Sequence, residues 1–179
     1  AKHSFPTRRS SDLVLSGTIG ANRTLSKDTV YVLRGFVYVA NGATLTISAG
    51  TKIVGDTTAL GSALFVLRGA RIVANGSESQ PIVFTSQRSA GTRSPGDWGG
   101  LVLVGNARNN RSGSIIIEGS NGSVVGADPN GTVYTGGSVD TDNSGTLRYV
   151  RVELPGKQRT LTLGTPTPIT PQGTAGTPP

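Results

Sequence analysis

The chain contains no cysteine and no methionine, and its single histidine is His3. Without thiols, disulfide bonds and cysteine nucleophiles are excluded, while the redox compartment stays open because both exported and cytosolic proteins can lack cysteine. Only 15% of the residues are charged, against about 25% in typical soluble domains. No apolar run approaches the roughly 18 residues of a membrane-spanning helix, so we expect no membrane span.

The formal net charge of +7 is concentrated at the two ends of the chain. Between residues 14 and 154 there are 12 basic and 9 acidic residues, and no basic run with interleaved aromatic residues occurs there. Nucleic-acid binding requires a clustered basic surface. We therefore expect no nucleic-acid partner.

The first residues carry a signature of their own. The stretch HSFPTRRSSDL, residues 3–13, resembles the translation of a common adapter that is ligated to DNA fragments for sequencing. We therefore expect residues 1–13 to be a non-native segment. His3 is then not a residue of the native protein, and a serine nucleophile would have no histidine base.

From residue 15 onward, short runs of β-branched and aromatic residues alternate with Gly, Asn, Asp and Ser. Run length and composition are typical of strands, with turn residues between them. No window shows an apolar stripe at helical spacing. The sequence therefore predicts an all-β protein with strands near 29–33, 36–39, 43–47, 52–54, 63–67, 70–73, 81–85, 101–104, 114–118 and 146–153.

An internal repeat favours a coiled arrangement of these strands. VLRGFVYVANG at 32–42 and VLRGARIVANG at 66–76 agree at eight of eleven positions, with an offset of 34 residues. Such repeats are typical of stacked architectures, and Gly35 and Gly69 suit corners that need positive φ. The alternative is an antiparallel β-sandwich, in which Asn-Gly marks hairpins. The coil is favoured because the repeat copies strand, corner and strand together.

Several segments carry a family resemblance: TVYVLRGFVYVANGATLTISAGTKIVGD, ALFVLRGARIVANG, GDWGGLVLVGNA and DNSGTLRYVRVE. Together they resemble secreted bacterial right-handed parallel β-helix proteins, a family often described as surface lipoproteins or outer-membrane secretion cargo. The resemblance spans about residues 15–153. It implies a β-helix and a secreted or cell-surface location, and it supplies no catalytic residues.

Besides residues 1–13, the sequence predicts two further segments. Residues 14–154 are expected to form a partial β-helix with uncapped ends, which would favour self-association. Residues 155–179 are rich in Thr, Pro and Gly, and we interpret them either as a linker or as the product of a frameshift.

The strongest local motif for metal binding begins at Asp140. Asp140, Asp142 and Ser144 offer oxygen atoms at alternate positions, and Gly145 is the sixth residue, as in the first half of a calcium loop. The twelfth position is Arg151 instead of the expected Glu. The sequence therefore leaves two interpretations open, a calcium site or a polar turn.

Two functional hypotheses remain at this level. The first is a non-enzymatic structural or adhesive module, exported to the cell surface and able to bind glycans; Trp98 is a candidate sugar contact, although packing is the alternative. The second is a carbohydrate-active enzyme, a polysaccharide lyase or hydrolase, with its catalytic coils outside this fragment. Glu118 and Glu153 each end a strand run and are the acids that could share one face, with a solvated strand end as the favoured interpretation.

Overall fold

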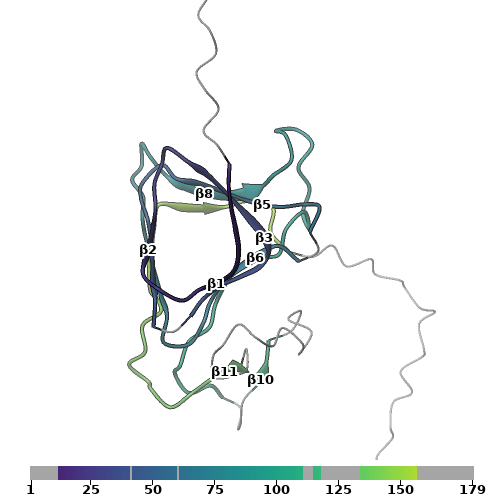
Figure 1. The fold of residues 1–179 in the computed structure, drawn as a ribbon. Coiled ribbons are helices and arrows are strands. Elements are labelled where there is room, and N and C mark those ends of the chain that lie inside the picture. The colour runs from purple at the N-terminus through teal and green to yellow at the C-terminus, as the bar shows by residue number, and fades with distance from the viewer. Residues whose placement is uncertain (1–11, 41, 60, 111–114, 118–133, 157–179) are drawn as a thin grey trace, which may run out of the picture.

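A computed structural model describes residues 12–40, 42–59, 61–110, 115–117 and 134–156 (Figure 1). The expected adapter segment lies almost entirely outside these residues, and so does the Thr/Pro tail beyond Gly156. The described residues contain no helix, and no helix that could cross a membrane. Their strands are β1 (Leu13–Ile19), β2 (Arg23–Leu25), β3 (Val30–Val39), β4 (Thr44–Ile47), β5 (Lys52–Gly55), β6 (Ala63–Val66), β7 (Arg71–Asn75), β8 (Ile82–Ser86), β9 (Gly100–Leu103), β10 (Ile115–Ile116), β11 (Tyr134–Thr135), β12 (Gly145–Arg148) and β13 (Val150–Val152).

Parallel pairing winds the chain into a coil with three faces. Face 1 contains the first half of β3 with β5, β8 and β13, and face 2 contains the second half of β3 with β6 and β9. Face 3 contains β2, β4, β7 and β12. Figure 1 shows these strands stacked around an almost closed outline. The predicted parallel β-helix is confirmed, and the sandwich alternative is not observed.

Glycine allows one strand to serve two faces. Gly35 lies between the two halves of β3 with a φ of 65°, a backbone conformation that costs little only for glycine. The sequence predicts two strands separated by a corner here, at 29–33 and 36–39. The structure joins them into the single bent strand β3 because the ladder continues on both sides of Gly35, to β5 on face 1 and to β6 on face 2.

The core is built from inward columns of apolar side chains in register. On face 1, Tyr31 pairs with Ile53 and Ile53 pairs with Phe84, and all three side chains are buried. On face 3, Leu45 pairs with Ile72, and both are completely buried. In-register stacking places side chains about 4.8 Å apart, so each coil covers the apolar residues of the previous one.

The 34-residue repeat does not mark one turn of the coil. Val66 pairs with Val39, not with its repeat equivalent Val32. Consequently Gly35 lies between faces 1 and 2, whereas Gly69, with a φ of 77°, follows β6 at the corner between faces 2 and 3. The same corner sequence serves two different corners because both require a positive φ.

The predicted strand at 146–153 is in fact two strands on different faces. β12 pairs with β7 on face 3, and β13 pairs with β8 on face 1. The break falls at Tyr149, whose φ is 49°. Sequence inspection misses this corner because it contains neither glycine nor asparagine. It also misses β1, β2 and β11, which are short or rich in polar residues.

A long excursion separates β9 from β12 and includes the antiparallel pair β10 and β11. Outside the coil, Tyr38, Phe65 and Val104 belong to a second apolar cluster, against which Ile117 packs. The Tyr38 hydroxyl is buried without a hydrogen-bond partner among the described residues, and burial raises the pKa of Tyr38 to about 12. The excursion is anchored by a hydrogen bond from Arg68 to the carbonyl of Gly136, 3.0 Å long.

Candidate functional site

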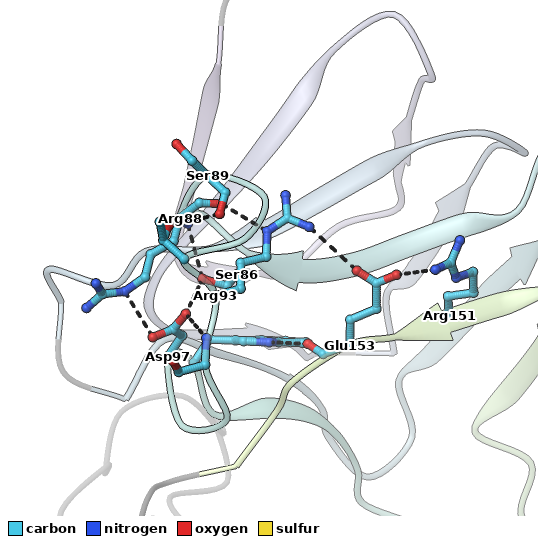
Figure 2. A network of polar contacts seen from close by, with 10 residues as sticks. Ser86, Arg88, Ser89, Arg93, Asp97, Arg151 and Glu153 are labelled. Carbon is cyan, nitrogen blue, oxygen red and sulfur yellow. Dashed lines mark hydrogen bonds and ion pairs between the residues drawn. The ribbon is translucent and has the colours of Figure 1, made fainter.

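The corner between faces 1 and 2 carries a polar loop, residues 87–97, that is organised by Asp97. The Asp97 carboxylate accepts hydrogen bonds from the Ser86 hydroxyl at 2.6 Å and the Ser94 amide at 2.9 Å. Arg88 Nε lies 3.0 Å from its other oxygen. The hydrogen bond from Ser86 is the main reason that the pKa of Asp97 is lowered, with the Ser94 amide and Arg88 adding to it against the effect of burial. Asp97 therefore stays ionised at neutral pH and fixes the loop (Figure 2).

Trp98 anchors this loop to the core. Its ring stacks on Phe84, with centroids 6.4 Å apart and an interplanar angle of 8°, and its indole Nε1 donates to the carbonyl of Glu153 at 2.9 Å. The side chain is only 2% exposed. Trp98 was a candidate glycan contact in the sequence; in the structure its ring is part of the core, as the packing interpretation expects.

Glu153 continues the polar surface beyond the loop. Its carboxylate lies 3.7 Å from an Arg93 guanidinium nitrogen and also contacts Arg151. Arg93 Nε in turn donates to the carbonyl of Arg88 at 2.9 Å. These residues come from the loop, from β13 and from the position that follows β13. Figure 2 shows Arg93 between Arg88 and Glu153. We call Arg88, Arg93, Asp97, Arg151 and Glu153 the corner cluster.

A second buried carboxylate lies at the same corner, one coil away. Asp56 is 1% exposed and accepts a hydrogen bond of 2.7 Å from Arg34 Nε. It also accepts from the hydroxyl and the amide of Thr58. The Thr58 hydroxyl and then Arg34 lower the pKa of Asp56 to about 2, against the opposing effect of burial. The carboxylate is thus fixed in its ionised form.

A pocket of about 340 Å³ opens between these two layers of the corner. It offers hydroxyl groups, a guanidinium and a carboxylate, which together donate and accept hydrogen bonds in several directions. Arg88 is bound to Asp97 through Nε, while 53% of its side chain is exposed. Such a lining suits a ligand rich in hydroxyl groups. The lining residues are Thr57, Arg88, Ser94, Pro95, Gly96 and Asp97.

The residues predicted to bind calcium have other partners. Asp140 forms an ion pair with Arg108, which lowers the pKa of Asp140. Asp142 accepts a hydrogen bond of 2.8 Å from the Asn106 amide, and the Ser144 carbonyl accepts from the Ile72 amide. Within the part of the chain that the structure describes, no three His, Cys, Asp or Glu side chains are grouped to hold a metal. Asp140 and Asp142 are thus engaged with Arg108 and Asn106.

The remaining sequence candidates divide between described and undescribed residues. Glu118, weighed as an acid that could share a face with Glu153, lies outside the described residues. Glu153 instead contacts arginines from two other segments. Arg88 and Arg93 were not candidates in the sequence. The available signal was the length of the polar segment between β8 and β9, since loops that exceed their neighbours often carry function.

Comparison with known proteins agrees with this architecture. Residues 17–162 match the family described as pectate-lyase-like β-helix domain. The chain belongs to this family. No curated protein and no solved structure shows significant similarity to the chain. Membership in the pectate-lyase-like β-helix family accounts for the three-faced parallel coil, while the corner cluster has to be interpreted from its own chemistry.

Proposed function

We propose that this pectate-lyase-like β-helix domain is a non-enzymatic, exported structural or adhesive module that binds a glycan at the corner pocket. The observation that carries the proposal is the pocket itself, in which Arg88, Ser94 and Thr57 surround an ionised Asp97. Sugars are recognised through several directional hydrogen bonds, and a side chain held in place loses little conformational entropy when it makes them.

The acids at this corner favour binding over catalysis. General acid catalysis at neutral pH requires a carboxyl group with a raised pKa, and a carboxylate with a lowered pKa is a weak base. The pKa values of Asp56 and Asp97 are both lowered by their hydrogen-bond partners. Their carboxylates fix the loops and leave the exposed part of Arg88 to contact a ligand.

A carbohydrate-active enzyme is the second candidate, and one observation favours it. The corner cluster brings two acids and three arginines onto one surface, and such a convergence is also expected in a lyase or hydrolase groove. The two candidates differ in product formation, since a lyase releases unsaturated oligosaccharides and a hydrolase releases new reducing ends.

The test is to titrate the full chain with oligogalacturonides and cello-oligosaccharides by calorimetry, and to assay the same mixtures for products. We expect binding without product. The Arg88→Ala variant should weaken binding about tenfold or more, by the cost of losing one charge-assisted hydrogen bond. Arg71→Ala, which removes an exposed arginine at the start of β7 on face 3, is the matched control. Released sugars would favour the enzyme. Undiminished binding by Arg88→Ala would mean that the glycan does not bind at the corner pocket.

The exported location is tested separately in the cells that produce the protein. Protease added to intact cells should degrade the chain if it lies on the outer surface, and the culture medium should contain it if it is secreted. Full protection in intact cells, lost only on lysis, would contradict an exported location.

A further inference from the structure

Tyr149 occupies a strained corner between β12 and β13. Its φ of 49° lies in the left-handed region, which is rare for a bulky residue and is stabilised only by its surroundings. Two hydrogen bonds hold the corner, from the Ile82 amide to the Tyr149 carbonyl at 3.0 Å and from the Gly76 amide to the Arg148 carbonyl at 2.8 Å. Residue 76 has to be glycine, because a Cβ on Gly76 would lie 2.6 Å from the Tyr149 carbonyl oxygen.

The strained backbone presents an aromatic ring to solvent. Tyr149 is 48% exposed, whereas Tyr31 and Tyr38 are 5% and 4% exposed. The guanidinium carbon of Arg148 lies 5.5 Å from the Tyr149 ring centroid, a cation–π contact that restrains the ring. An exposed, restrained aromatic ring with a polar tip is suited to contact a ligand that has both apolar and polar faces.

Tyr149 is in line with the corner cluster along β13. Arg151 pairs with Val83, whose neighbours Ile82 and Phe84 are buried in the core. Because strand side chains alternate, Arg151 points outward, and Glu153 follows two residues later. At about 3.3 Å per residue in a strand, the backbone distance from Tyr149 to Glu153 is at most about 13 Å.

Contacts between side chains connect Glu153 to the pocket. Glu153 contacts Arg93, and Arg93 donates to the carbonyl of Arg88, which lines the pocket. An aromatic ring, three arginines and two carboxylates thus follow one another from the corner at Tyr149, along β13, to the corner at Asp97. This spacing exceeds what a ligand confined to the pocket can contact.

We propose that Tyr149 is the distal contact of an extended oligosaccharide that runs along β13 from the corner pocket. Its ring stacks on a sugar ring, and Arg151 donates hydrogen bonds to the hydroxyl groups between the two ends. This inference rests on the proposed glycan binding and adds that the ligand is a chain of several sugars. A disaccharide fills the pocket alone, whereas a hexasaccharide also reaches Tyr149.

The test compares disaccharides and hexasaccharides of the oligogalacturonide and cello-oligosaccharide series, titrated into the full chain. Tyr149→Ala should weaken hexasaccharide binding about tenfold, as loss of one stacking contact implies, and leave disaccharide binding unchanged. Tyr149→Phe, which keeps the ring, should bind both like the parent. Tyr149→Gly, which accepts the left-handed φ without strain, should behave like Tyr149→Ala and so separates ring loss from backbone strain.

The outcomes distinguish the two proposals. Equal hexasaccharide affinity of the parent and Tyr149→Ala, together with weakened binding by Arg88→Ala, overturns the distal contact and keeps the pocket. Weakened binding by Tyr149→Ala with no effect of Arg88→Ala supports the distal contact and overturns the pocket. Absence of binding by the parent overturns both.

Discussion

Gly55 lies directly against Trp98. A Cβ built on Gly55 would overlap the Cβ of Trp98 and lie 2.8 Å from its Cγ. The missing side chain of β5 thus makes room for the indole ring that anchors the corner loop, and the two residues act as one packing unit across successive coils.

We expect Gly55→Ala to destabilise the fold. Overpacking a well-filled core typically costs about 1–3 kcal/mol, and both the ring and the adjacent backbone would have to shift. Thermal or urea unfolding of the full chain measures the change. Gly105→Ala is the matched control, since its Cβ would meet only Asp142, at an ordinary 3.5 Å. Equal stability of the two variants would contradict the packing relationship.

Trp98 provides an internal probe of both folding and binding. It is the single tryptophan of the chain and is buried beside Phe84. We expect blue-shifted emission and weak acrylamide quenching in the native state, followed by a red shift on unfolding. If Trp98 only packs, saturating oligosaccharide leaves its emission maximum unchanged. A direct glycan contact would instead shift the maximum or protect the ring from quenching.

The pKa of Asp56, lowered to about 2, predicts a loss of stability in acid. A carboxyl group with a lower pKa in the folded than in the unfolded chain stabilises the fold above its unfolded pKa of about 3.9. That contribution, about 1–2 kcal/mol after allowance for screening of the exposed Arg34, is lost as the pH falls from about 5 towards 2.

Asp56→Asn tests this assignment. The variant should be less stable than the parent at pH 6, and the difference should shrink as the pH is lowered, as followed by urea unfolding at each pH. Glu78→Gln, which removes an exposed carboxylate, should leave the pH profile of the parent intact. A constant difference between Asp56→Asn and the parent at all pH values would exclude a titration effect of Asp56.

Asp97 is expected to control the order of the corner loop. Asp97→Ala removes the acceptor of the Ser86 and Ser94 hydrogen bonds and the partner of Arg88. Limited trypsin digestion should then cleave at Arg88 or Arg93 several times faster than in the parent, because an ordered loop resists proteolysis. Glu78→Gln digested under the same conditions reports any general effect of charge removal. Unchanged cleavage would mean that Asp97 is not needed to hold the loop.

Chelation tests the calcium interpretation of Asp140, Asp142 and Ser144. Since Asp140 pairs with Arg108 and Asp142 accepts from Asn106, we expect the same melting temperature with and without a chelator. A site occupied only in the native state would raise the melting temperature with calcium concentration. A lower melting temperature after chelation, reversed by added calcium, would establish the metal site.

Much of the architecture was readable in the sequence because it depends on local chemistry. Short β-branched runs predict strands, and glycines such as Gly35 and Gly69 predict corners. The parallel coil therefore followed from the pattern. The corner at Tyr149 was not predictable. Its left-handed backbone is imposed by hydrogen bonds from the amides of Ile82 and Gly76 and by the space that Gly76 leaves free, which are tertiary contacts.

The sequence by itself thus determined the fold class, most of the coil-forming strands and the absence of cysteine chemistry. Only the tertiary structure decided that Trp98 is buried over Gly55, that Arg93 meets Glu153, and that a polar pocket opens beside Asp97. The physical reason is register. Which residues of one coil lie against the next depends on the length of every loop between them, and no local pattern encodes that sum.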